Sequence, residues 1–234
     1  MSSSLRPQRW CAWAGVVFLV LFAIGMVVAH FIPPPSANQS LGQVQATYAH
    51  HIDRLRIGLT VMILASGFYA PWSGVISVQL KRLEGEFSPF AYTELACGAA
   101  NMLVVMLPLY IMLAAAFRPL RDPQITQALS DLGWIPFIGA FVPTVISNLV
   151  IAGAILTSEK TDVYPRWVAY LNLACVPLLL PAVAIPFFKT GAFAWQGALE
   201  FWLAAVTFFG WFLVMTIATL SAVNRQSAAA SVPA

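Results

Sequence analysis

The sequence GEFSPFAYTE, residues 85–94, is a turn that leads directly into a long apolar segment. It carries the carboxylate of Glu94 past the point at which the chain is expected to leave water. Gly98 and Asn101 follow at steps of four and three residues, so the three residues share one face of a helix. A carboxylate inside a membrane span is a functional candidate, because burying it without a partner is costly. The alternative is that Glu94, close to the helix start, reaches headgroup water and favours the positive end of the helix dipole.

The composition of the chain is that of a membrane protein. Of its 234 residues, 60% are hydrophobic and 9% are charged, whereas soluble globular proteins contain about 25% charged residues. The net charge of +3 is too small to indicate a nucleic-acid partner. Cys11, Cys97 and Cys175 lie inside apolar runs and show no CxxC spacing, so neither a disulfide framework nor a zinc site is expected.

Six apolar runs reach the length of about 20 residues that a helix needs to cross the hydrocarbon core of a bilayer. They are residues 10–32, 57–80, 95–117, 132–158, 167–188 and 201–224, and none contains Asp, Glu, Lys or Arg. We therefore expect an all-α membrane protein with six transmembrane helices. The six helices form a single domain, residues 1–226, and the Ser/Ala-rich residues 227–234 are expected to be a disordered tail.

Two stretches between the spans predict short interfacial helices. Apolar residues recur at steps of three and four from Leu41 to Leu55, which predicts a helix from about residue 38 that runs into the second span. Before the fourth span, Asp122 is placed to cap a helix whose first residue is Pro123. Gly133 is a residue of the type that ends helices, so this second interfacial helix is expected to stop there.

The basic residues of the loops and tails predict the orientation of the chain in a bacterial inner membrane. With the N-terminus inside, the inner side carries seven of them: Arg6, Arg9, Lys81, Arg82, Lys160, Arg166 and Arg225. The outer side then carries five: Arg54, Arg56, Arg118, Arg121 and Lys189. Because cytoplasmic loops are enriched in Lys and Arg, we expect both termini in the cytoplasm and both interfacial helices on the outer side.

A second stretch, GAFAWQGALE at residues 191–200, resembles the first in its aromatic residues and in its carboxylate, Glu200. The similarity suggests that spans one to three and four to six form a 3+3 inverted repeat, which is typical of secondary transporters. Short matches in apolar sequence also arise by chance, and chance stays the alternative. Glu200 lies near the start of the sixth span, so it is a candidate ligand-binding residue for the same reason as Glu94.

The fourth and fifth spans combine polar residues with helix-breaking ones. Asn148 lies near the middle of the fourth span, with Ser147 beside it and Thr144 one turn earlier on the same face. An amide at that depth either binds a ligand or joins helices through hydrogen bonds worth about 1 kcal/mol or less. Breaks in a membrane helix are tolerated only where neighbours satisfy the freed backbone groups. Prolines interrupt these two spans at Pro136, Pro143, Pro177, Pro181 and Pro186.

Metals and cofactors are not expected. His30, His50 and His51 all fall at the outer membrane boundary, and an interfacial role is favoured over a metal site because membrane metal centres need more ligands inside the spans. The sequence contains no Walker loop, GxGxxG, GxSxG or HExxH motif. Nucleotide hydrolysis and a catalytic triad therefore have no support, and an embedded enzyme is the least favoured class.

Four motifs carry a resemblance to a family. They are RPLRDP at residues 118–123, DLGW at 131–134, PRW at 165–167 and FKTGAFAW at 188–195. Through them the chain resembles, over most of residues 10–224, an uncharacterised family of bacterial multi-span integral membrane proteins. No activity is established for that family, so the resemblance implies a membrane location and a fold, and it carries over no functional residue.

Two classes of function follow from these patterns. The first is a binder or carrier of a small apolar or amphiphilic molecule, with Glu94, Asn101, Asn148 and Glu200 as candidate ligand-binding residues. The second is a non-catalytic accessory or assembly subunit of a membrane complex, which the scarcity of buried charge favours. The expected partners are the lipid bilayer and either a small apolar ligand or a membrane protein. A cavity lined by Glu94, Asn101 and Asn148 would favour the first class, and a packed bundle would favour the second.

Overall fold

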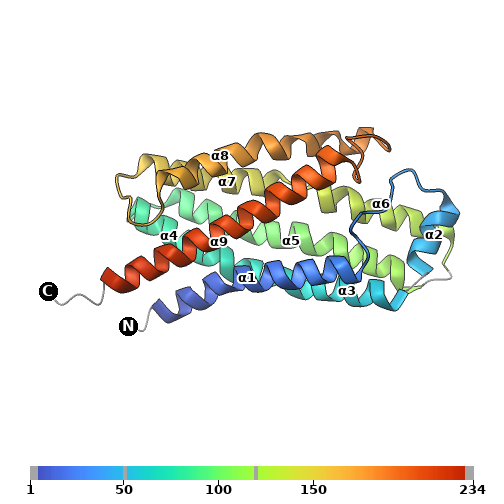
Figure 1. The fold of residues 1–234 in the computed structure, drawn as a ribbon, viewed down its shortest axis with the longest axis horizontal. Helices are drawn as coiled ribbons and strands as arrows, with labels where there is room; N and C mark the ends of the chain where they lie inside the picture. Colours follow the sequence, from blue (N-terminus) through green and yellow to red (C-terminus); the bar gives the residue numbers. More distant parts are fainter. Residues whose placement is uncertain (1–4, 50–51, 119–120, 230–234) are drawn as a thin grey trace.

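Long helices that run side by side make up the protein (Figure 1). The computed structural model describes residues 5–49, 52–118 and 121–229. These residues contain no strand, and six of their helical segments are long and apolar enough to cross a membrane. The predicted all-α, six-span membrane fold is confirmed. The six segments are Leu5–Val28, Ile52–Glu84, Pro89–Phe117, Pro123–Thr157, Arg166–Phe187 and Ala198–Ala229.

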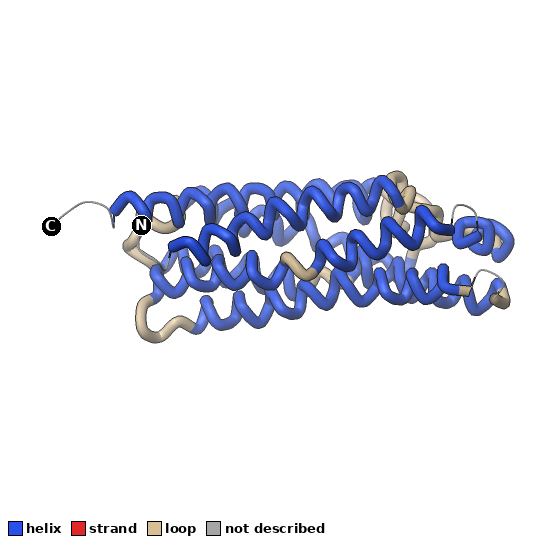
Figure 2. Tube along the Cα trace, turned by 90° about the horizontal axis from the view of Figure 1, so that it is seen from below, coloured by secondary structure: helices blue, strands red, loops and turns tan. Residues whose placement is uncertain are grey.

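Four of the six spans are built from more than one element, because a turn or a change of helix type interrupts them. Figure 2 shows the loops gathered at the two ends of the bundle and a non-helical interruption inside it. In chain order the elements are α1 (Leu5–Val28), α2 (Leu41–Ala49), α3 (Ile52–Ser66), α4 (Tyr69–Glu84), α5 (Pro89–Phe117), α6 (Pro123–Gly139), α7 (Val142–Thr157), α8 (Arg166–Leu179), the 3₁₀ helix η1 (Leu180–Phe187), the π-helical turn η2 (Ala198–Trp202) and α9 (Leu203–Ala229).

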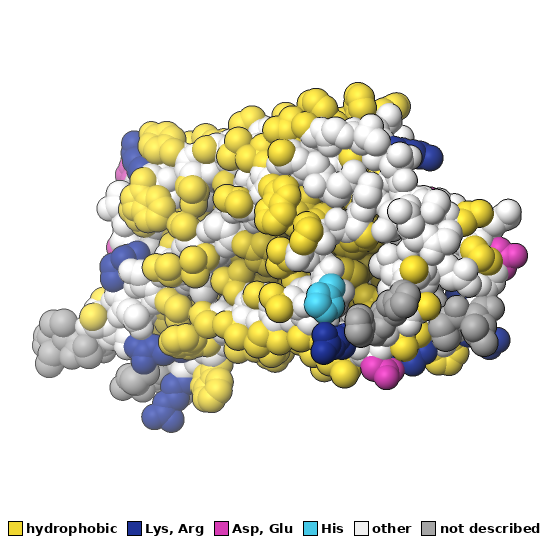
Figure 3. Space-filling model, turned by 45° about the vertical axis from the view of Figure 1, so that its right-hand side comes forward, with side chains coloured by type: hydrophobic (Ala, Val, Ile, Leu, Met, Phe, Trp, Pro, Cys, Tyr) yellow, Lys and Arg dark blue, Asp and Glu magenta, His cyan; other side chains and the backbone are white. Residues whose placement is uncertain are grey.

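The two chain termini lie at the same end of the bundle, on the left of Figure 1. We call this the terminal end, and the opposite end, which carries α2, the far end. Apolar side chains cover the middle of the face shown in Figure 3, and Lys and Arg gather towards its two ends. Val27, Leu64 and Val206 are large apolar residues with more than half of their surface exposed. Water would solvate such a belt poorly, whereas a bilayer covers it.

The breaks inside the spans lie at or close to glycine or proline residues. Span two turns at Gly67 and Phe68, between α3 and α4. The PWSG sequence that starts at Pro71 lies in the first turns of α4, where a proline loses no helical hydrogen bond. Span four breaks at Ala140 and Phe141, after Pro136 and before Pro143. The fifth span changes from α to 3₁₀ geometry at Leu180.

The structure has a helix at each of the two stretches predicted between spans but changes their bounds, and the second, α6, forms the first part of the fourth spanning segment rather than a separate interfacial helix. The first is α2, which begins at Leu41. The second begins at Pro123 as predicted, and the Asp122 side chain accepts a hydrogen bond from the Gln124 amide at 2.8 Å. Gly133 does not end it, because Gly133 packs against Met112 of α5 and the helix continues to Gly139.

The first three residues of the predicted tail belong to a helix. Helix α9 continues to Ala229, so residues 227–229 are helical rather than part of a disordered tail. The rest of the predicted tail, residues 230–234, lies outside the described residues.

Helix α5 is the centre of the bundle, because it contacts α3, α4, α6 and α7. Helices α1 and α9 pack against α4 from the other side. The main aromatic contact there is Trp72 of α4 stacked on Phe212 of α9, with ring centroids 3.7 Å apart. Phe18 of α1 stacks on the same Phe212 at 4.6 Å. This arrangement buries the polar face of α5 between α4 and α7, where the candidate site lies.

Candidate functional site

Glu94 lies inside the bundle, with 1% of its surface exposed. The Ser73 hydroxyl of α4 donates a hydrogen bond to one of its carboxylate oxygens, Oε1, at 3.1 Å. The Ser147 hydroxyl of α7 donates to the other, Oε2. Among the described residues no Lys, Arg or His forms an ion pair with Glu94. Glu94 therefore does not reach headgroup water; it joins three helices through two hydroxyl groups.

The local sequence explains how Glu94 is held at this depth. Pro89 starts α5, and the Glu84 carboxylate accepts hydrogen bonds from the backbone amides of Phe90 and Ala91 at 3.0 and 2.7 Å. These bonds satisfy amides that a helix start leaves without partners. One turn after Glu94, Gly98 contacts Ser73 so closely that a Cβ atom on residue 98 would overlap the serine side chain. The glycine thus lets α4 approach α5 near enough for Ser73 to reach Glu94.

Asn101 forms a second polar link between the same two helices, α5 and α7. The Thr144 hydroxyl donates to Asn101 Oδ1 at 2.9 Å. The other amide atom, Nδ2, is buried and has no hydrogen-bond partner in the described structure. The hydroxyl of Tyr69, the first residue of α4, lies beside Asn101, but the two side chains do not reach hydrogen-bond geometry. The pair therefore leaves donor groups available to a further oxygen atom.

A partly open cavity of about 110 Å³ lies beside Asn101 and Thr144. The two residues are its polar part, and the rest of its wall is apolar. Alanines 204 and 205 leave room on the side of α9. Aromatic side chains of α1, α6, η2 and α9 complete the wall: Phe22, Phe137, Phe201, Phe208 and Phe209. The cavity is thus a small apolar chamber with one hydrogen-bonding corner.

Asn148 and Glu200 are buried without partners. Both side-chain atoms of Asn148, in the middle of α7, lack a hydrogen bond in the described structure. Both carboxylate oxygens of Glu200 are likewise unpartnered, and the residue is fully buried. Glu200 lies in η2, and π-helical turns are frequent at functional sites. Its neighbour Phe201 lines the cavity, but Glu200 does not.

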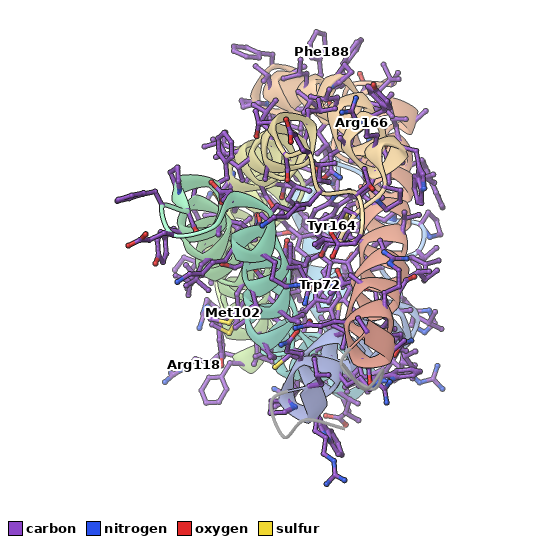
Figure 4. All side chains as sticks on the ribbon, turned by 90° about the vertical axis from the view of Figure 1, so that its left-hand side faces the viewer. Trp72, Met102, Arg118, Tyr164, Arg166 and Phe188 are labelled. Carbon is purple, nitrogen blue, oxygen red and sulfur yellow. The ribbon has the colours of Figure 1, made fainter. Side chains whose placement is uncertain are left out.

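The terminal end of the bundle is closed. Trp72 and Tyr164 lie near the centre of the view from this end, between α4 and α9 (Figure 4). The Tyr164 hydroxyl bonds to that of Thr219 at 2.9 Å, and burial raises the pKa of Tyr164 well above its usual value. Arg225 donates to the backbone carbonyl groups of Asp162 and Val163 at 2.9 and 2.7 Å. These bonds hold the loop between α7 and α8 across the terminal end.

The described residues contain no group of three or more His, Cys, Asp or Glu that could hold a metal ion. His30 is described and lies at the end of α1, whereas His50 and His51 lie outside the described residues. Cys97 and Cys175 are buried and Cys11 is half-buried, all as free thiols.

The structure brings together only part of the predicted site. Glu94 and Asn101 share one face of α5 as predicted, but Asn101 alone of the four candidates lines the cavity. Sequence reasoning missed Ser73, which lies in the PWSG stretch inside the second span, and Tyr69. The one signal in the sequence was Gly98 on the Glu94 face, which indicates the close approach of another helix.

Comparisons of the chain with family models, with curated proteins and with solved structures find no match. The resemblance to a family of bacterial multi-span membrane proteins stays a prediction. The geometry of the site is therefore the basis on which a function for the protein is proposed.

Proposed function

We propose that the protein binds or carries a small apolar or amphiphilic molecule in the cavity beside Asn101. The observation that carries the proposal is the chemistry of the cavity wall, which is aromatic and aliphatic except for Asn101 and Thr144. The volume of about 110 Å³ is close to that of apolar protein cavities that hold benzene. It is well below the range of roughly 300–1,000 Å³ for drug-sized ligands. The cavity suits a small molecule or one end of a longer one.

The unpartnered amide group of Asn101 indicates the polar part of the ligand. Its Nδ2 atom is a buried donor, and a buried donor without a partner costs about 1–3 kcal/mol. A carbonyl, ether or hydroxyl oxygen on the ligand would accept its hydrogen bond. The favoured ligand is therefore an apolar body that carries one acceptor oxygen.

Carriage across the membrane would require the terminal end to open. The bonds of Arg225 to the loop at Asp162 and Val163, and the bond of Tyr164 to Thr219, would have to break. In the closed arrangement the ligand reaches the cavity from the bilayer or from the far end. Under this proposal the closed arrangement is one end state of a carrier, or the state of a binding protein that does not transport.

For location we propose a bacterial inner membrane with the terminal end in the cytoplasm. The basis is the count of basic residues in the loops and tails, seven at the terminal end against five at the far end. Reporter fusions at the C-terminus and within residues 36–40 should report opposite sides of the membrane, with the C-terminal one inside. A cytoplasmic signal from residues 36–40 would overturn this orientation.

Native mass spectrometry of the gently solubilised protein tests the function. We expect a bound molecule of defined mass that is released on collisional activation. Ala205→Phe places a large side chain in the cavity and should remove this species. Its matched control is Val206→Phe on the next residue, which is 71% exposed and faces away from the cavity. This control should retain the bound molecule.

The outcomes separate the two classes of function. A bound mass that Ala205→Phe leaves unchanged would contradict the cavity as the site. A stoichiometric partner chain in place of a small molecule would favour the alternative, an accessory or assembly subunit. Both variants should show the wild-type melting temperature within a few degrees, so that loss of the ligand is not loss of the fold.

A further inference from the structure

A second pocket, of about 380 Å³, opens at the far end of the bundle, where α1 ends and α3 begins. It shares no lining residue with the cavity beside Asn101. Its wall combines apolar residues, among them Phe31, Pro33 and Leu55, with the basic side chains of Arg54 and His30. In Figure 3 the described histidine, drawn in cyan, lies on the surface beside Lys or Arg side chains.

Arg54 enters this pocket with its charge unpaired. In the described part of the chain it makes no ion pair and no hydrogen bond. The nearest carboxylate in the sequence, Asp53, pairs with Arg56 at 3.6 Å. Arg56 also donates to the carbonyl group of Ala116 at 3.0 Å, so it is engaged at the end of α5. A guanidinium group left free in a concave site is suited to bind a phosphate through two parallel hydrogen bonds.

His30 occupies a backbone position that favours glycine. Its amide donates to the carbonyl group of Val27, and the amide of Phe31 donates to that of Met26. This is the hydrogen-bond pattern of a Schellman motif, and its left-handed residue is usually glycine. The φ angle of His30 is 55°. An imidazole here lines the pocket and supplies at least one N–H donor in either protonation state.

The surroundings of the pocket indicate that its ligand comes from the bilayer. Val27, Ile32 and Ile57 are 63%, 48% and 57% exposed on the same ends of α1 and α3. They extend the apolar belt up to the pocket, which therefore lies at the boundary between hydrocarbon and headgroups. Basic pockets between transmembrane helices are known binding sites for anionic lipid headgroups on the cytoplasmic side, and the same combination of charge and apolar surface is present at this end of the bundle.

We propose that this pocket binds the phosphate group of an anionic phospholipid, with Arg54 and His30 as the donors and the acyl chains along α1 and α3. The site is independent of the cavity beside Asn101. A free phosphate ion offers the same chemistry to the two donors, but it would not use the apolar rim. The two sources are therefore distinguished by whether the diacyl part of the molecule contributes to binding.

The test is native mass spectrometry with added phosphatidylglycerol, phosphatidylcholine or inorganic phosphate. We expect one phosphatidylglycerol molecule to bind at least about tenfold more tightly than phosphatidylcholine, which corresponds to about 1.4 kcal/mol. Arg54→Gln should reduce the affinity for phosphatidylglycerol to that for phosphatidylcholine. The matched control is Arg118→Gln, which removes the same charge at the far end from a side chain that points away from the bundle (Figure 4).

The variant His30→Gly tests whether the imidazole contributes to lipid binding without a loss of stability. Glycine accepts the positive φ angle without strain, so this variant should unfold at the same temperature as the wild type or higher. It should nevertheless lose most of the preference for phosphatidylglycerol, because one donor is gone. Equal losses in Arg54→Gln and Arg118→Gln would show a general charge effect and overturn the proposal. Binding of inorganic phosphate without a preference between the two lipids would overturn the assignment to a lipid.

Discussion

The two halves of the bundle differ in how completely most of their buried polar groups are hydrogen-bonded. In the terminal half Glu94 accepts two hydroxyl hydrogen bonds, Trp72 donates to Thr216 at 2.8 Å, and Tyr164 bonds to Thr219. In the far half the Asn101 amide and the Glu200 carboxylate keep atoms without partners, and in the terminal half Asn148, the residue after Ser147, is an exception with both amide atoms unpartnered. The far half also contains the 3₁₀ and π segments and the cavity.

This difference indicates which buried groups stabilise the fold and which are available to a ligand. A buried hydrogen bond that is complete stabilises one arrangement of the helices, and its loss leaves several groups unsatisfied. A buried group without a partner weakens the fold, because its lost hydration is not replaced, and it is available to a ligand. Glu94 and Glu200 carry the same carboxylate at similar places in their spans. We therefore expect Glu94 to matter for stability and Glu200 for what the protein binds.

The largest expected effect comes from Gly98→Ala. The new methyl group would overlap Ser73 and push α4 away from α5, which also separates Ser73 from Glu94. We expect a loss of about 3 kcal/mol in the free energy of unfolding, measured by denaturant titration in a fixed detergent. The control is Gly210→Ala in α9, where no atom lies within 4 Å of the added Cβ. It should stabilise the helix by up to about 1 kcal/mol, and equal effects of the two substitutions would contradict the close contact.

Glu94→Ala is expected to cost about 2 kcal/mol, because it leaves the Ser73 and Ser147 hydroxyls buried without their acceptor. Glu94→Gln should cost about 1 kcal/mol or less, since the amide oxygen still accepts one of the two bonds. The same unfolding experiment measures both. If Glu94→Ala left the free energy of unfolding unchanged, Glu94 would behave like the unpartnered groups. Glu94 and Glu200 would then not differ in their effect on stability.

Two asparagines allow the comparison to be repeated with amide groups. Asn172 of α8 donates to the carbonyl group of Val168 at 2.7 Å and accepts from Trp211 at 2.8 Å. Asn172→Ala should therefore destabilise the protein by about 1 kcal/mol. Asn148→Ala should cost less, because both atoms of that amide lack partners. The reverse order of the two melting temperatures would show that Asn148 has a structural partner after all.

The smallest change in stability is expected for Glu200→Gln. Because the Glu200 carboxylate makes no hydrogen bond in the described structure, its replacement should change the free energy of unfolding by less than about 0.5 kcal/mol. If Glu200 serves the ligand, the same variant should alter the occupancy of the bound molecule seen by native mass spectrometry. Glu94→Gln, in contrast, should leave that occupancy unchanged. Equal occupancy in wild type and both variants would remove Glu200 as a ligand-binding residue.

The sequence alone determined the class of fold, the six spans and the capped start of α6. These features depend on local sequence. A run of about 20 apolar residues has the length and composition to cross a bilayer. The Asp122 side chain accepts its hydrogen bond from the Gln124 amide, only two residues away. It also predicted that Glu94, Gly98 and Asn101 share a face, since helix geometry settles that. It did not predict the end of α6, because Gly133 is held inside the helix by its contact with Met112 of α5.

Only the tertiary structure decided which polar groups have partners. Ser73 and Ser147 are 21 and 53 residues from Glu94 in the chain, and nothing local brings either of them to the carboxylate. The contact of Gly98 with Ser73 and the position of α7 beside α5 do so. The same packing leaves Glu200 without a partner, although its sequence surroundings resemble those of Glu94. Which buried groups become hydrogen-bond partners depends on the distances between helices. The periodicity of apolar residues along one helix carries no information about those distances.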